Sequence, residues 1–133
     1  MDDISIVGLV IAALAFFALG GVWYTVLFGK AWRAEMGISE EEAAGKSPDP
    51  LMFVWSILVA LVIAGTLAKL VGACGTEYGL KVGAGVGVGI GAAILAQNYV
   101  YESRSFRFFL INAGYVVVGL TLMGAIVGGF QTP

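Results

Sequence analysis

The apolar stretches of this sequence contain few side chains that could bind a ligand or react. Most of these side chains lie a similar number of residues away from a charged connecting segment. Together they form one candidate polar layer: Trp23, Tyr24, Gln97, Asn98, Arg104, Asn112 and Tyr115. In helices that rise 1.5 Å per residue, all of them except Arg104 would lie about 5–12 Å inside one membrane boundary. A buried amide in lipid needs a hydrogen-bond partner, so we expect the layer to face neighbouring helices.

Two interpretations of the polar layer stay open. In the structural one, Asn98 and Asn112 bond each other across a helical hairpin, as interhelical amides commonly do. Aromatic residues then form an interfacial belt, which consists of Trp23, Tyr24, Trp32 and Tyr101. In the functional one, the layer is the floor of a cytoplasm-facing pocket with Arg104 at its mouth.

Catalytic chemistry has little support in this sequence. Histidine is absent and Cys74 is the single cysteine, so the usual transition-metal ligands and the commonest general base are missing. The apolar stretches contain no Asp or Glu that could serve as acid or base. We therefore expect a protein that is not an enzyme, with no catalytic residue, no cofactor and no metal site.

The composition identifies the surroundings of these residues. The chain has 133 residues, of which 59% are hydrophobic and a further 20 are glycine, whereas only 7 are basic and 9 acidic. A soluble domain of this size would expose that much apolar surface as an aggregating patch. The chain is therefore predicted to be an integral membrane protein in contact with lipid. Its net charge of −2 does not favour nucleic acid as a partner.

Four apolar segments reach the length of about 20 residues that a helix needs to cross a bilayer. They cover residues 4–28, 51–74, 82–101 and 108–130. Runs such as residues 57–63 do not alternate as a membrane β-strand would. The predicted fold is all-α: an integral membrane four-helix bundle that forms a single transmembrane domain over residues 1–133.

The first connection, residues 29–50, is predicted to be the longest, and it carries most of the charge. We expect the first helix to continue past the membrane to a left-handed cap at Gly37. Ser39 with Glu42 matches the capping box of a short surface helix. Pro50 then opens the second span.

The remaining connections are predicted to be tight turns at residues 75–79 and 102–105. Lys and Arg are unequally divided between the two sides of the membrane. The first and third connections hold five of them: Lys30, Arg33, Lys46, Arg104 and Arg107. The opposite side holds Lys69 and Lys81 at most. This excess predicts that the first and third connections face the cytoplasm and that both termini lie outside it.

Glycines recur every four residues in the last two predicted spans. In the third span, one row that could pack helices consists of Gly83, Gly87 and Gly91, and Gly85 with Gly89 forms a second row. In the fourth span, the row consists of Gly124 and Gly128. Small residues at this spacing let helix backbones approach closely, as in a glycine zipper. One partner helix needs only one such row. The second row therefore indicates either a contact with further copies of the chain, in a homo-oligomer, or the lining of a narrow path through the membrane.

Several motifs carry a family resemblance. They are residues 20–32 (GGVWYTVLFGKAW) with Met36-Gly37, residues 98–104 (NYVYESR), residues 109–115 (FLINAGY) and residues 123–126 (MGAI). In order and spacing, nearly end to end, the chain resembles the small bacterial membrane-protein family called domain of unknown function 1761. The resemblance implies a four-span protein of the bacterial inner membrane, and it implies no activity.

Two functions of different kinds fit these features. In the leading hypothesis, the chain forms a homo-oligomeric, channel- or transporter-like bundle for a small solute. In the alternative, it is a structural or accessory subunit that transports nothing and packs with its own copies or within a larger membrane complex. A water-accessible path would favour the first, and a dry, tightly packed assembly the second.

Overall fold

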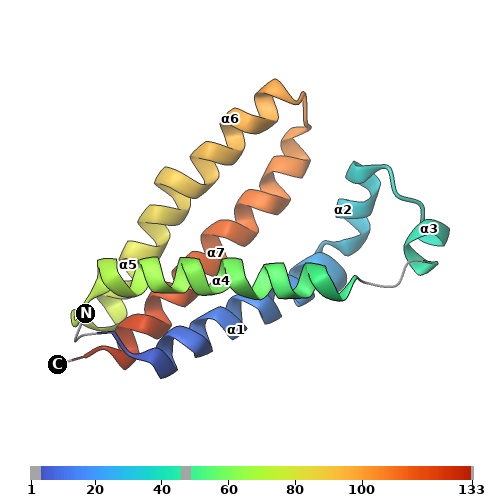
Figure 1. The fold of residues 1–133 in the computed structure, drawn as a ribbon. Coiled ribbons are helices and arrows are strands. Elements are labelled where there is room, and N and C mark those ends of the chain that lie inside the picture. The colour runs from blue at the N-terminus through green and yellow to red at the C-terminus, as the bar shows by residue number, and fades with distance from the viewer. Residues whose placement is uncertain (1–3, 46–48, 133) are drawn as a thin grey trace.

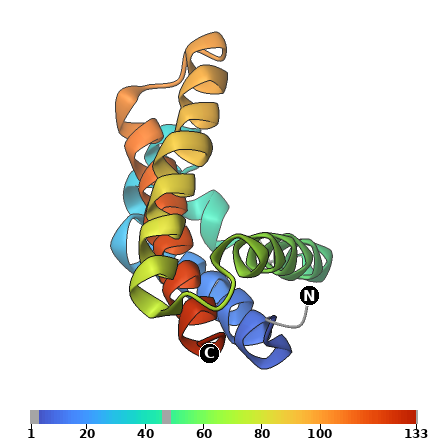
Figure 2. The same cartoon turned by 90° about the vertical axis from the view of Figure 1, so that its left-hand side faces the viewer.

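The computed structural model describes residues 4–45 and 49–132, and every regular element in these ranges is a helix. Four helices are long and apolar enough to span a membrane: Ile6–Leu27, Pro50–Val71, Gly75–Tyr101 and Phe106–Phe130. The chain is thus an all-α, multi-pass membrane protein, as its composition predicts. Two helical pairs converge at the end that carries both termini and diverge toward the opposite end (Figures 1 and 2). These are called the closed end and the open end.

The first span begins as α1 (Ile6–Val22), continues as a wide π-helical turn η1 (Trp23–Leu27) and is followed by α2 (Gly29–Met36). The Ser5 hydroxyl caps α1 by accepting the Gly8 N–H at 3.0 Å. The predicted left-handed cap is confirmed, since Gly37 ends α2 with φ of 73°. The expectation of one continuous helix is wrong at a single point, because η1 and Phe28 (φ −128°) interrupt it.

The first connection contains α3 (Glu40–Ala44), and its predicted capping box is confirmed. The Ser39 hydroxyl accepts the Glu42 N–H at 3.1 Å and donates to the Glu42 carboxylate at 3.1 Å. Lys46 lies outside the described residues. α4 (Pro50–Val71) opens at its proline as predicted, with the Asp49 carboxylate accepting the Leu51 N–H at 3.0 Å.

The third span begins earlier than predicted. It consists of α5 (Gly75–Val86), a second π-helical turn η2 (Gly87–Ala92) and α6 (Ala93–Tyr101). The prediction of a turn over residues 75–79 is therefore wrong, and this segment is helical. An ion pair of 3.2 Å between Glu77 and Lys81 supports the first turns of α5, and Gly79 in this segment packs directly on the last span.

The last span is α7 (Phe106–Phe130), which packs against α5 over the whole closed half of the molecule (Figure 2). A Cβ built on Gly79 would overlap the Gly124 carbonyl oxygen, and one on Gly128 would overlap that of Gly75. Only glycine fits such backbone contacts. All the glycines predicted to pack helices lie in this interface with the same chain: Gly83, Gly87, Gly91, Gly124 and Gly128.

The second glycine row has different surroundings. Gly85 and Gly89 are exposed, and a Cβ built on either of them would have no heavy atom within 4 Å. The row therefore points away from α7. The contact with another chain that we predict for it stays a prediction.

The closed end also holds the core of the bundle. Its fully buried side chains include Leu67, Val71, Met123 and Val127. Gln131, which is only 3% exposed, donates from Nε2 to the carbonyls of Ala68 (3.0 Å) and Gly72 (2.9 Å) at the end of α4. Its Oε1 accepts the Ser5 N–H at 3.3 Å. One amide thus joins the ends of three spans.

Candidate functional site

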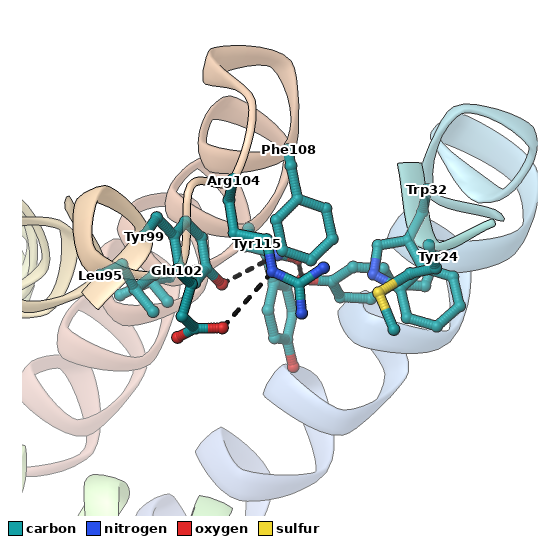
Figure 3. A pocket seen from close by; sticks show the side chains of 11 residues that line it. Tyr24, Trp32, Leu95, Tyr99, Glu102, Arg104, Phe108 and Tyr115 are labelled. Atoms are coloured by element: carbon teal, nitrogen blue, oxygen red, sulfur yellow. Dashed lines mark hydrogen bonds and ion pairs between the residues drawn. The ribbon is translucent and has the colours of Figure 1, made fainter. Parts of the chain in front are cut away.

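A cavity of about 550 Å³ lies at the open end, between the first span with α2 on one side and α6 with α7 on the other (Figure 3). This volume falls in the range of small-molecule sites. We call it the open-end cavity. Its wall consists of Tyr24, Trp32 and Met36 from the first side, and of Leu95, Tyr99, Glu102, Arg104, Phe108, Asn112, Tyr115 and Val116 from the second.

The π-helical turn η1 positions two consecutive aromatic residues against α7. Phe28 donates its N–H to the Trp23 carbonyl at 2.8 Å, a bond that spans five residues and so widens the turn. The Trp23 indole donates to the Ile111 carbonyl at 2.8 Å, and the Tyr24 hydroxyl donates to Asn112 Oδ1 at 2.6 Å. The first span is thereby bonded to α7 at the depth of the predicted polar layer.

Asn112 is the centre of a hydrogen-bonded chain that crosses three helices. Its Oδ1 accepts from Tyr24 on η1, and its Nδ2 donates to the Tyr99 hydroxyl on α6 at 3.0 Å. All three side chains are half-buried and line the cavity. A half-buried amide in a membrane needs such partners, and here they come from other spans.

The structure separates Gln97 and Asn98 from the rest of the predicted polar layer, because both are exposed. The predicted hydrogen bond between Asn98 and Asn112 is wrong, since Asn112 bonds Tyr24 and Tyr99 and no bond to Asn98 occurs among the described residues. The physical reason lies in η2. A π turn holds more residues than an α turn and shifts the helix face that follows it.

Tyr99 is the residue that sequence reasoning missed, and its position had a signal. The residues of the third span that meet α7 or line the cavity recur every four positions: Gly79, Gly83, Gly87, Gly91, Leu95 and Tyr99. The helix-packing row thus continues straight into the cavity wall. The predicted aromatic belt is divided, because Trp32 lines the cavity whereas Tyr101 is 83% exposed.

Tyr115 lies at the inner limit of the cavity. Its hydroxyl donates to the Phe16 carbonyl at 2.9 Å, and its ring stacks on that of Phe16 with centroids 4.6 Å apart. The Tyr24 ring meets it edge-on at 5.3 Å. Tyr24 and Tyr115 also line a second cavity of about 410 Å³ between α1 and α4. This tyrosine pair therefore forms a shared wall of both cavities.

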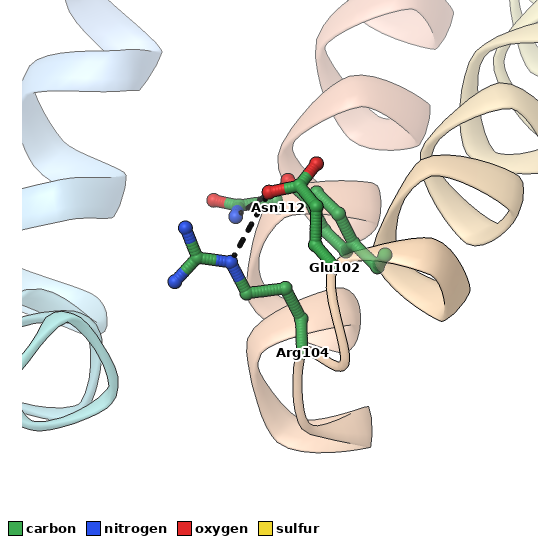
Figure 4. A network of polar contacts seen from close by, with 4 residues as sticks. Glu102, Arg104 and Asn112 are labelled. Atoms are coloured by element: carbon green, nitrogen blue, oxygen red, sulfur yellow. Dashed lines mark hydrogen bonds and ion pairs between the residues drawn. The ribbon is translucent and has the colours of Figure 1, made fainter.

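Arg104 lines the cavity from the turn between α6 and α7. Its Nε pairs with Glu102 Oε1 at 3.4 Å (Figure 4). Its guanidinium carbon lies 5.0 Å from the centroid of the Phe108 ring. The Ser105 hydroxyl caps α7 by accepting the Phe108 N–H at 3.0 Å and also bonds the Glu35 carboxylate on α2. The turn is thus attached to the other side of the open end.

The chemistry of this site is that of binding. Its polar groups are three tyrosine hydroxyls, one amide, one carboxylate, one guanidinium and one indole N–H, on a wall that is otherwise apolar and aromatic. Among the described residues, no group of three or more His, Cys, Asp or Glu side chains could hold a metal ion. Such a wall can enclose an apolar body and orient a polar end.

Comparison with known proteins gives a family but no function. The sequence model of the family described as "Protein of unknown function (DUF1761)" matches residues 7–128. The chain belongs to this family. The match includes every motif that carries the resemblance, and it includes the whole wall of the open-end cavity. Neither the curated proteins nor the solved structures gave a match.

Proposed function

We propose that the protein binds a small solute in the open-end cavity and passes it through the membrane, as a transporter-like bundle without a catalytic step. The observation that carries the proposal is the shared tyrosine wall. The cavities of about 550 and 410 Å³ adjoin the same pair, Tyr24 and Tyr115, from different sides. Movement of these two rings would connect the cavities.

The wall of the open-end cavity supports a binding role. Five aromatic side chains contribute to it: Tyr24, Trp32, Tyr99, Phe108 and Tyr115. Asn112 accepts a hydrogen bond from the Tyr24 hydroxyl and donates one to the Tyr99 hydroxyl, and these bonds fix two of the rings before any solute arrives. A pre-formed wall reduces the entropy that binding would cost.

We also infer that the open end faces the cytoplasm of a bacterial inner membrane. The excess of Lys and Arg in the first and third connections supports this orientation. Cys74, which is free and exposed in the turn between α4 and α5, provides a direct test. A membrane-impermeant maleimide should label Cys74 from outside intact cells, whereas Glu41→Cys in a Cys74→Ala background should react only after permeabilisation. The reverse pattern would overturn the orientation.

The transport proposal is tested by filling the cavity. Leu95 lines the open-end cavity, whereas its neighbour Ile94 is 53% exposed on the outer surface. In proteoliposomes, the parent should carry at least one member of a panel of small labelled amphiphiles and polar solutes faster than protein-free vesicles do. Leu95→Trp should reduce that flux about tenfold or more, and Ile94→Trp should not. Absence of flux, or equal flux in both variants, would contradict the proposal.

One observation favours the second candidate, an accessory subunit that packs with its own copies or within a larger complex. Gly85 and Gly89 form an exposed row on the outer face of the third span, with open space around them. Small residues on a lipid-facing surface are typical of helix–helix contacts in membranes. A homo-oligomer that forms through this row is compatible with solute transport. It would also fit an accessory subunit that transports nothing.

A further inference from the structure

We propose that the ligand of the open-end cavity is a single-chain amphiphile with an anionic head, a carboxylate or a phosphate, which the Arg104 guanidinium binds. The inference rests on the proposed function in one respect, since it requires that the cavity binds a solute. It adds the chemical class of that solute and the residue that recognises its head.

The head site is the free edge of the Arg104 guanidinium. Arg104 uses Nε for its ion pair with Glu102, and among the described residues its two terminal nitrogens have no acceptor. Figure 4 shows these nitrogens pointing away from Glu102, into the gap toward the first span. A guanidinium edge of this kind binds carboxylate or phosphate with two parallel hydrogen bonds.

The ion pair with Glu102 leaves this edge available. Its single contact is 3.4 Å long, and the two side chains are 39% and 51% exposed, so the pair is weak. Glu35, the other carboxylate near the turn, accepts a hydrogen bond from Ser105. An anion that engages both terminal nitrogens of Arg104 would therefore gain contacts that the chain itself does not make.

A cationic ligand fits this wall less well, although aromatic rings often bind cations. The protein's own cation already occupies that environment, since Arg104 lies over the Phe108 ring at 5.0 Å. Figure 3 shows the guanidinium between Phe108 and the pair of Tyr24 and Trp32. A second positive charge would meet like charge in a partly desolvated site.

The tail site is the deeper part of the same cavity. Its lining runs from Arg104, in the turn before α7, to Val116 within α7, which is about 15 Å along a helix that starts at Phe106. Apart from the Asn112 amide and the tyrosine hydroxyls, this depth offers apolar surface. A charged head at the turn and an apolar body directed into the bilayer reproduce the orientation of a membrane amphiphile.

The experiment compares four probes that carry the same octyl tail, nonanoate, octyl phosphate, octanol and octyltrimethylammonium, by the fluorescence of Trp32 in nanodiscs. Trp32 lines the cavity, and the same titrations of Trp32→Phe show which part of the fluorescence change comes from Trp32. The parent should bind one or both anionic probes at least tenfold more tightly than octanol. The better of the two anions identifies the head as carboxylate or phosphate.

Three variants assign the effect to Arg104. Arg104→Gln should reduce the affinity for the anions at least tenfold and leave that for octanol unchanged. Arg107→Gln, three residues away, exposed and outside the cavity wall, should change neither. Glu102→Gln should increase the affinity for the anions several-fold because it releases Nε, and a merely damaged turn would not produce such a gain.

The possible failures are distinguishable. Equal binding of all four probes, preference for octyltrimethylammonium, or unchanged anion affinity in Arg104→Gln would overturn the anionic ligand. If Leu95→Trp still blocked binding in those cases, the proposed function would stand. Absence of binding by every probe would overturn the anionic ligand, and the flux assay would then decide the proposed function separately.

Discussion

The closed end and the open end of this bundle use polar and small residues in opposite ways. At the closed end, glycine backbones touch between α5 and α7, and the buried Gln131 side chain makes its three hydrogen bonds to main-chain groups. At the open end, a cavity lined by large aromatic side chains lies between the first span and the pair of α6 and α7, and Asn112 bonds to side chains that border it. Main-chain contacts fix the closed end, whereas replaceable side-chain contacts hold the open end.

This difference assigns separate tasks to the two ends. Lipid supplies no hydrophobic drive for helices to associate, so stability must come from close packing and satisfied hydrogen bonds. The closed end provides both. The open end can therefore keep a cavity of about 550 Å³ between the diverging pairs without loss of the fold. We expect substitutions at the closed end to affect stability, and those at the open end to affect binding more than stability.

The largest effect should come from adding one methyl group to a closed-end glycine. In Gly79→Ala the new Cβ would overlap the Gly124 carbonyl, and backbone cannot move aside as a side chain can. We expect a loss of about 3 kcal/mol or more, measured by thermal unfolding in detergent. The matched control is Gly85→Ala on the same helix, where the Cβ meets open space. Equal melting of the two variants would contradict the α5–α7 interface.

A smaller effect is expected at Gln131. Gln131→Leu leaves the Ala68 and Gly72 carbonyls and the Ser5 N–H without this partner, which should cost about 1–2 kcal/mol. Gln97→Leu removes the same amide from an exposed site and should change stability by less than about 0.5 kcal/mol. Comparable melting temperatures for the two variants would show that Gln131 does not join the spans.

The contrast between the ends also explains how far the sequence predicted the structure. Span length and local chemistry are properties of short segments, so the four spans, the Gly37 cap and the Ser39–Glu42 capping box could be predicted. The glycine row that packs on α7 follows from the four-residue spacing in the same way.

The π turns are what the sequence did not reveal. Neither Trp23–Leu27 nor Gly87–Ala92 has a local signal in the sequence that distinguishes a π turn from an α turn. Both turns contact α7, and such contacts between distant segments cannot be read from a short stretch of sequence. The consequence for the candidate site is specific. Tyr24, Arg104, Asn112 and Tyr115 from the predicted polar layer line one cavity, whereas the partner of Asn112 on α6 is Tyr99 and not its neighbour Asn98. A register shift of one residue accounts for that difference.

The open end should respond modestly to loss of its hydrogen bonds. Tyr24→Phe and Asn112→Leu should each cost about 0.6–1 kcal/mol, the usual range for interhelical bonds in membranes. Because the two groups bond each other at 2.6 Å, the double variant should cost less than the sum of the single losses. Thermal unfolding of the four proteins measures this coupling. Asn98→Leu, at an exposed position, is the control and should be silent. Strict additivity would indicate that the bond does not connect the spans.

The smallest effect on the fold, and the most informative about assembly, is expected on the outer glycine row. Gly85→Leu with Gly89→Leu places two large side chains in open space, so the melting of the monomeric bundle should change by less than about 0.5 kcal/mol. If this row contacts another copy of the chain, the same change should abolish the oligomer, because leucine prevents close approach of the backbones. Native mass spectrometry of parent and variant from nanodiscs measures the state directly. A parent that is monomeric, or an oligomer that survives the double substitution, would remove this row as an interface and would leave the proposed binding cavity untouched.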